Sequence, residues 1–253
     1  AKFDQNFNSQ YSYIAKVGYP MGMMYGFIYE GTYKYEDFDK VGDTYTLKRN
    51  VPYFSSESNT QPGMPKYADL NGDGIIDDND RTMIGNGMPK HTGGFTNNFE
   101  YKGFDLSIFF QWSYGNDVLN ANRLFFENSN KTRDLNQYAS YADRWTPENP
   151  ESNIPRATDS GSNKVFSTRI IEDGSFLRLK TVSLGYTLPK QLTKKWKIDN
   201  ARVFVAGQNL WTCTGYSGYD PEVSIREGAL TPGLDFSAYP RAYSISFGIN
   251  LGF

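Results

Sequence analysis

One short segment carries oxygen-bearing side chains at the spacing of a calcium-binding loop. Asp69, Asn71, Asp73, Ile75, Asp77 and Asp80 occupy ligand positions 1, 3, 5, 7, 9 and 12 of that pattern, where Ile75 would offer its backbone carbonyl. Gly74 stands at position 6, where the loop must turn sharply. Hard oxygen ligands on a flexible loop select calcium over magnesium. The pattern predicts a bound calcium, at lower affinity because Asp80 replaces the longer Glu at position 12.

The surroundings of this loop leave an alternative open. An EF-hand needs an amphipathic helix before the loop, but residues 61–68 (QPGMPKYA) contain two prolines. The alternative is a polar, glycine-rich turn without a metal. No catalytic group stands nearby, so we expect the role of a calcium to be structural, holding a loop that faces the outside.

The last eleven residues indicate what this loop is attached to. Apolar side chains alternate with small or polar ones without a miss: Tyr243, Ile245, Phe247, Ile249, Leu251 and Phe253 are separated by Ser, Ser, Gly, Asn and Gly. A period of two predicts a β-strand with one apolar face. A tilted strand of roughly 9–11 residues crosses a bilayer, and a soluble edge strand would usually carry charge. The segment predicts a membrane-inserted strand of a β-barrel.

Composition supports this prediction. Aromatic residues make up 16% of the 253 residues, which suits a barrel with an apolar outer band and aromatic girdles. A net charge of −2 without a basic stripe excludes nucleic acid as an expected partner. His91 is the only histidine, so a multi-histidine metal site is excluded, and we expect it in a loop. Cys213 is the only cysteine and cannot form an internal disulfide, and we expect it to be a small buried residue.

Further strand signals come in pairs. The predicted pairs are 10–17 with 23–30, 92–101 with 104–115 around the two-residue turn Lys102-Gly103, and 176–188 with 201–211. Arg178 and Lys180 interrupt the alternation of the third pair. Either these two side chains lie beyond the hydrocarbon, or a bulge shifts the register.

The connections alternate in length. Bacterial barrels have short periplasmic turns and long extracellular loops, which places 32–91, 116–174 and 212–240 outside and the turns 18–22, 102–103 and 188–200 in the periplasm. The predicted fold is all-β, an antiparallel transmembrane barrel of which residues 1–253 form the carboxy-terminal portion, about seven strands, without a plug domain. Because no signal peptide opens the chain, we expect a mature or truncated product.

Several segments together resemble the carboxy-terminal region of the SusC/RagA-like, TonB-dependent outer-membrane transporters. They are 67–74, 80–86, 101–110, 144–150 (RWTPENP), 176–189, 207–211 (GQNLW), 218–222 (GYDPE) and the terminal strand. The resemblance implies a plugged barrel in the outer membrane of a Gram-negative bacterium that imports oligosaccharides or peptides. It also implies a SusD-like surface lipoprotein as a lid, membrane lipid around the barrel, and coupling to the TonB complex through a plug region that this chain lacks.

Aromatic side chains in the predicted outer loops are candidates for stacking on cargo, and packing within the loops is the alternative for each. They are Tyr138, Tyr141, Trp145, Tyr216 and Tyr219. A second function considered is a secreted, calcium-dependent binding module without transport. A third is a glycosidase using carboxylates of one loop, Asp143, Glu148, Glu151 and Asp159, although no spacing singles out a pair. We expect no enzymatic activity.

Overall fold

The computed structural model describes residues 1–7, 10–128, 136–158, 165–225 and 228–253. It is mostly β-structure, and no helix in the described part of the chain is long and apolar enough to cross a membrane. The chain divides into two compact units. The first comprises 1–88, 117–172 and 224–238, and the second comprises 89–116, 173–223 and 239–253.

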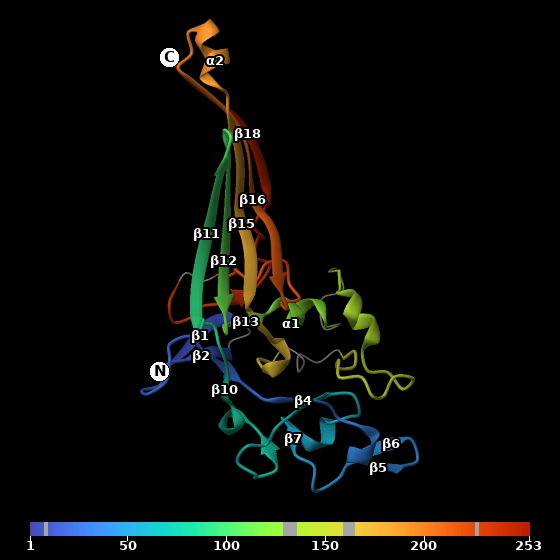
Figure 1. Ribbon diagram of the computed structural model, residues 1–253. Helices are drawn as coiled ribbons and strands as arrows, with labels where there is room; N and C mark the ends of the chain where they lie inside the picture. Colours follow the sequence, from blue (N-terminus) through green and yellow to red (C-terminus); the bar gives the residue numbers. More distant parts are fainter. Residues whose placement is uncertain (8–9, 129–135, 159–164, 226–227) are drawn as a thin grey trace. The chain divides into compact units, whose positions relative to one another are not determined.

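The second unit contains one antiparallel sheet of five long strands, in the order β11-β12-β15-β16-β18 (Figure 1). The strands are β11 (His91–Tyr101), β12 (Phe104–Tyr114), β15 (Phe176–Thr187), β16 (Asn200–Thr214) and β18 (Ser244–Gly252). The five corresponding predicted strands are confirmed, within a few residues at each end. Lys102 and Gly103 form the tight turn between β11 and β12 with φ of 48° and 86°, the left-handed geometry of a two-residue hairpin.

The register of this sheet separates apolar from polar residues over all five strands. One row of directly paired residues is Phe99, Leu106, Leu184, Val205 and Phe247. The neighbouring row, one residue along each strand, is Asn98, Ser107, Ser183, Ala206 and Ser246. Adjacent residues of a strand point to opposite faces. The sheet therefore has an apolar face and a face of small and polar side chains.

A bulge explains the charged residues of β15. Leu179 pairs with Phe110 and Thr181 with Phe109, so Lys180 has no partner of its own on β12. The extra residue puts Arg178 opposite Gln111, on the polar face, while Leu177 and Leu179 stay on the apolar face. Of the two explanations offered by the sequence, the bulge is therefore confirmed. The short connection after β15 holds α2 (Lys190–Thr193) and the 3-10 turn η7 (Lys194–Trp196).

The first unit is built from short strands. One four-stranded sheet has the order β1-β2-β3-β10, with β1 (Lys2–Phe7), β2 (Gln10–Ile14), β3 (Met23–Gly26) and β10 (Thr82–Asn86). The remaining strands pair in twos and threes: β4 (Tyr29–Thr32), β5 (Phe38–Val41), β6 (Thr44–Leu47), β7 (Tyr53–Phe54), β8 (Pro65–Tyr67), β9 (Ile75–Ile76), β13 (Asp117–Asn120), β14 (Ile171–Asp173) and β17 (Leu234–Asp235). Its α-helix is α1 (Asn122–Phe126). Buried Tyr13, Met24 and Phe166 belong to its largest core cluster.

The first predicted strand pair lies in this unit, and its predicted topology is wrong. β2 pairs with β3, as expected, but Tyr13 and Met24 are fully buried in the core instead of facing lipid. Gly22 accepts a backbone hydrogen bond from Gly87, and Tyr13 donates its hydroxyl to the carbonyl of Pro232. The turn 18–22 thus packs against residues of 32–91 and 212–240, which were assigned to the opposite side of the membrane. Strand length misled the prediction, because both strands are too short to span a bilayer.

Candidate functional site

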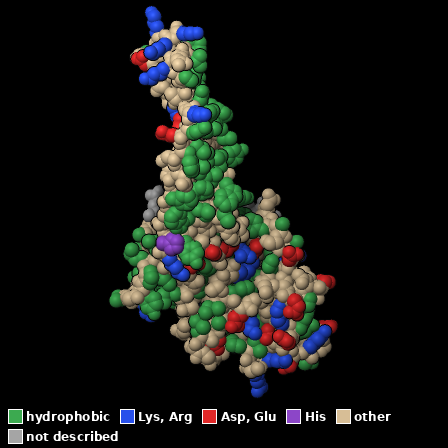
Figure 2. Space-filling view, in the orientation of Figure 1, with side chains coloured by type: hydrophobic (Ala, Val, Ile, Leu, Met, Phe, Trp, Pro, Cys, Tyr) green, Lys and Arg blue, Asp and Glu red, His purple; other side chains and the backbone are tan. Residues whose placement is uncertain are grey.

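The apolar face of the five-stranded sheet is open to its surroundings. Phe99 is 58% exposed and Phe247 81% exposed, and neighbouring large side chains such as Phe95, Ile245 and Ile249 are exposed as well. Figure 2 shows hydrophobic side chains gathered over these strands. A soluble domain seldom exposes so extensive an apolar patch. The face is suited to contact lipid, as the predicted membrane strand Tyr243–Phe253 requires.

The polar face is crossed by an ion pair at the end of the sheet that holds the Lys102-Gly103 turn. Arg202 of β16 donates to both carboxylate oxygens of Asp105 on β12, at 2.9 and 2.5 Å, across the intervening strand β15. Gly185 of β15 leaves the room for this contact: a Cβ there would lie 2.3 Å from the guanidinium and 2.5 Å from the carboxylate. A side chain at position 185 would therefore push the two charged groups apart.

We expect Gly185→Ala to separate Asp105 from Arg202 and to lower the unfolding temperature of the protein slightly. The effect should be small because the guanidinium ends a flexible side chain and the pair is partly exposed to solvent. Thermal unfolding of single and double variants tests this. In an Arg202→Gln background the same alanine should cost less, and equal costs in both backgrounds would show that the ion pair is not what Gly185 accommodates.

A second, buried ion-pair cluster lies where β15 begins. Arg178 donates to Asp220 at 2.6 Å and lies 3.3 Å from Glu222, and both Arg178 and Asp220 are almost fully buried. Glu222 is also within 3.6 Å of Lys180 and 3.2 Å of Arg241. The cluster ties the connection after β16 to the bulge in β15 and to the approach to β18. It therefore links three strands of the five-stranded sheet.

Asp220 is the centre of this cluster. Its side chain accepts hydrogen bonds from the backbone N–H groups of Glu222 at 2.9 Å and Arg241 at 3.0 Å, in addition to the bond from Arg178. Burial by itself would raise the pKa of the Asp220 carboxyl, but the guanidinium of Arg178 and the two backbone donors lower this pKa below its ordinary value. Asp220 is therefore ionised in the folded protein at neutral pH.

The sequence contains one signal for this cluster. Two cationic residues, Arg178 and Lys180, interrupted an otherwise alternating strand, and a buried charge needs a partner. The segment 218–222 was singled out only for its resemblance. No spacing in the sequence connects Asp220 to Arg178, because they are 42 residues apart and meet only in the folded sheet.

The predicted calcium loop is closed by its own hydrogen bonds. Asp69 accepts from the backbone of Gly72 and Gly74, and Asp73 accepts from Ile75. Asp80 is fully buried and accepts from the backbone N–H groups of Leu70 and Asp77, so it joins the two ends of the loop. Gly74 has φ of +85°, the sharp turn that position 6 requires.

The fit of this loop to a metal is partial. Carboxylate oxygens keep a second lone pair when one is used by an N–H group, so the donor chemistry still suits a hard cation. Among the described residues, however, no three His, Cys, Asp or Glu side chains converge as a metal group would. Calcium binding at Asp69, Asn71, Asp73, Ile75, Asp77 and Asp80 stays a prediction.

The aromatic candidates for cargo contact differ in exposure. Tyr141, Trp145 and Tyr216 are buried, which leaves their rings without a free face for cargo. Trp145 packs over Gly63 and lies 5.6 Å from the ring of Tyr35. Tyr138 is partly buried and lies 5.4 Å from Phe126, whereas Tyr219 is 87% exposed. Packing within the loops therefore accounts for three of the five, and Tyr219 is the candidate that remains open.

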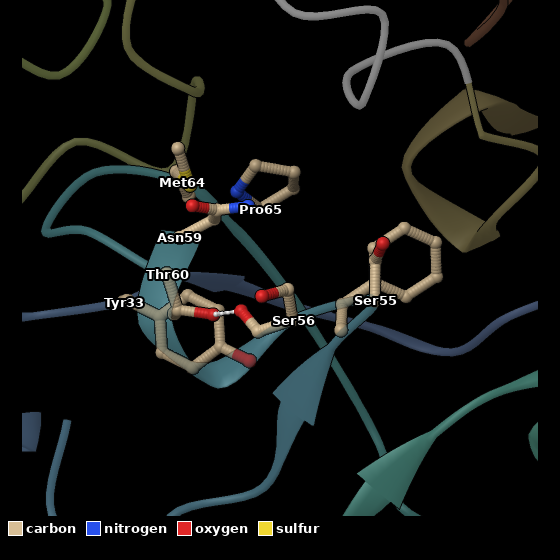
Figure 3. Close-up of a pocket in the computed structure, with 8 residues that line it drawn as sticks. Tyr33, Ser55, Ser56, Asn59, Thr60, Met64 and Pro65 are labelled. Atoms are coloured by element: carbon tan, nitrogen blue, oxygen red, sulfur yellow. Dashed lines mark hydrogen bonds between the residues drawn. The ribbon is translucent and has the colours of Figure 1, made fainter.

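A cavity of about 150 Å³ lies in the first unit (Figure 3). Its lining is Tyr33, Phe54, Ser55, Ser56, Asn59, Thr60, Met64 and Pro65, a mixture of aromatic, hydroxyl and amide groups. Thr60 donates its hydroxyl to the carbonyl of Ser56, and Ser55 holds φ of +69°, an uncommon conformation for serine. The sequence predicts a long loop over 32–91 and gives no sign of this cavity. The short strands in this segment show no regular alternation of apolar and polar residues.

Two single residues lie elsewhere than predicted. His91 is the first residue of β11 and not part of a loop: its Nδ1 accepts from the indole of Trp112 at 3.1 Å, and its ring stacks on Tyr114 at 5.0 Å. Cys213 is exposed and not buried. Cys213 lies on β16, two residues after Trp211. Both His91 and Cys213 therefore belong to strands that extend beyond their regular apolar alternation.

The amino-acid sequence is similar to those of several TonB-dependent receptors. No family model matches the chain. The chain is 34% identical to TonB-dependent receptor P3 of Formosa agariphila over 98% of its own length and 24% of that receptor. It is 39% identical to TonB-dependent receptor P26 of the same organism over 76% of its length, and 28% identical to TonB-dependent receptor SusC of Bacteroides thetaiotaomicron over 78%.

Solved structures agree with the sequence similarities. The RagAB peptide transporter matches 96% of this chain with a TM-score of 0.73 and 26% identity. The RagAB peptide importer in its closed-closed state matches the same share with a TM-score of 0.70 and 27% identity. The chain covers 24% of each of these solved chains and a quarter or less of the receptors named above.

Proposed function

Because this chain belongs to the SusC/RagA-like TonB-dependent receptors, we propose that it forms part of the wall of an outer-membrane barrel that imports nutrients. The five long strands supply the membrane-spanning wall, with the Phe99–Phe247 row toward lipid and the Asn98–Ser246 row toward the lumen. The cargo is an oligosaccharide or a peptide, the two classes that the family resemblance implies.

The two edges of the sheet support this proposal. Within the described residues, β11 pairs only with β12, and β18 pairs only with β16. A free strand edge inside a bilayer leaves backbone groups without hydrogen bonds, which is costly, so membrane sheets close into barrels. We propose that further strands of the whole receptor pair with β11 and β18 and close the barrel. From the same resemblance we propose a SusD-like surface lipoprotein as the lid and the TonB complex as the source of energy.

The exposed apolar rows count against the secreted binding module. Such a module would have to cover Phe95, Phe99, Phe247 and Ile249 in water, and these side chains are all exposed. The glycosidase hypothesis gains no support either, because the relatives found are receptors and transporters.

Fractionation of the native source tests the proposal directly. An antibody against the last strand should detect a band in the outer membrane that is heavier than 28.7 kDa and migrates differently with and without boiling. Deletion of the gene should then abolish growth on the cargo, and a panel of oligosaccharides and peptides separates the two classes. A soluble band near 28.7 kDa would contradict the barrel proposal.

We further propose that the loop Asp69–Asp80 binds calcium in the whole receptor. For the affinity typical of extracellular calcium modules, a dissociation constant of about 0.1–1 mM, calcium at roughly 10 mM should stabilise the loop unit by about 1.4–2.7 kcal/mol. Thermal unfolding with calcium or magnesium measures this. Asp69→Asn with Asp73→Asn should remove the gain, and a gain that survives in this variant would place the calcium elsewhere.

A further inference from the structure

The connection between β15 and β16 carries a concentration of positive charge. Lys190, Lys194, Lys195 and Lys197 fall within eight residues, and Asp199 is the one acidic residue of 189–199, while the whole chain has a net charge of −2. All four lysines are exposed, and none of them forms an ion pair with the described residues. We call 190–197 the lysine turn.

The lysine turn is an ordered structure with apolar side chains exposed beside the charges. The backbone N–H of Lys197 bonds to the carbonyl of Lys194 and that of Ile198 bonds to Thr193, whose side chain is buried. Leu192 is 51% exposed and Trp196 67% exposed. These two are four residues apart, which places them on one side of a helical turn. A large aromatic and a leucine beside four exposed ammonium groups form an amphipathic surface.

Along the strands that lead to the lysine turn, the side chains of the apolar face change from aliphatic to aromatic. On the apolar face of β15, Leu184 is followed by Tyr186, whose ring lies 4.5 Å from that of Phe104 on β12. Tyr101 is 69% exposed beside them. Aromatic rings at this position are typical of the boundary between hydrocarbon and headgroups. The lysines follow directly after the end of β15, beyond these aromatic rings.

We propose that the lysine turn binds anionic phospholipid headgroups of the leaflet that faces the periplasm. Lysine ammonium groups bind phosphate as point charges, while Trp196 and Leu192 enter the interface beneath them. Charge complementarity favours anionic over zwitterionic lipid, because the four lysines form no ion pair with any residue that the structure describes. The inference rests on the proposed function, since it requires the sheet to stand in the membrane with this end toward the periplasm.

The test measures phosphatidylglycerol binding to the full-length receptor in mild detergent by native mass spectrometry. Replacing Lys190, Lys194, Lys195 and Lys197 by Gln should weaken binding by up to about 600-fold, since each lysine near an anionic surface contributes about a fivefold gain. Binding of zwitterionic phosphatidylethanolamine should change little. At about 1 M salt the Debye length falls to about 3 Å, so the preference of the native receptor for the anionic lipid should disappear.

A matched control removes the same charge elsewhere. Replacement of Lys2, Lys16, Lys40 and Lys90, all exposed, by Gln should leave phosphatidylglycerol binding unchanged. Equal loss in the control, or native binding in the lysine-turn variant, overturns the inference. Heat-modifiable migration on a gel is read in parallel. A heat-modifiable receptor without lipid preference refutes the lysine turn alone, whereas a receptor that never enters the membrane refutes the proposed function with it.

Discussion

Replacing Asp220 by Asn is expected to destabilise the full-length receptor by about 3–5 kcal/mol, the usual cost of breaking a buried ion pair. Arg178 would lose its 2.6 Å charge-assisted bond while staying buried. An Asn amide also has one oxygen, whereas Asp220 uses both of its oxygens to accept from Arg178, Glu222 and Arg241. At least one donor would then be left facing an NH₂ group. Urea-induced unfolding in detergent measures the loss.

The pH dependence of this effect has a definite sign. The pKa of Asp220 is lowered in the folded state, so the carboxylate contributes stability above the unfolded-state pKa of about 4 and loses it as the pH falls through the lower folded-state value. The difference between native receptor and Asp220→Asn should therefore be full at neutral pH and narrow below about pH 4. Asp199→Asn, an exposed change, is the control. A difference that stays constant down to pH 2 would contradict the role of the charge.

Sequence alone predicted the long strands well because their chemistry is local. The alternation along Tyr243–Phe253 and the Lys102-Gly103 turn specify strands and register without knowledge of any partner. The same reasoning failed for β2 and β3, which are strands but belong to a packed core. Periodicity identifies a strand but does not say whether its apolar face meets lipid or protein, and Tyr13 and Met24 meet protein.

The candidate site was less predictable because its contacts are distant in sequence. The Arg178–Asp220 pair depends on a one-residue bulge at Lys180, which the sequence offered only as one of two explanations. Exposure of aromatic loop residues likewise follows from tertiary packing. Trp145 and Tyr219 look equivalent in the sequence, but one packs over Gly63 and the other is exposed.

With its apolar face against lipid, as proposed, the protein is expected to lose about 2–4 kcal/mol of stability when Phe247 is replaced by Arg, the usual cost of an arginine facing the middle of the bilayer. Phe247 is 81% exposed and lies in the apolar row that runs through Val205, Leu184, Leu106 and Phe99. In water such a change would be tolerated, because an exposed arginine is well solvated there. The predicted loss therefore depends on lipid lying against this face.

Ser246→Arg supplies the matched control at nearly the same depth. Ser246 is exposed, adjacent to Phe247, and pairs with Ala206 in the polar row, so its replacement should point into the aqueous lumen and cost little. Both variants are compared by urea unfolding after insertion into lipid vesicles and by the amount of receptor in the outer membrane. A loss for Phe247→Arg alone assigns the apolar row to lipid. Equal losses, or a greater loss for Ser246→Arg, would reverse the two faces of the wall and with them the proposed path of the cargo.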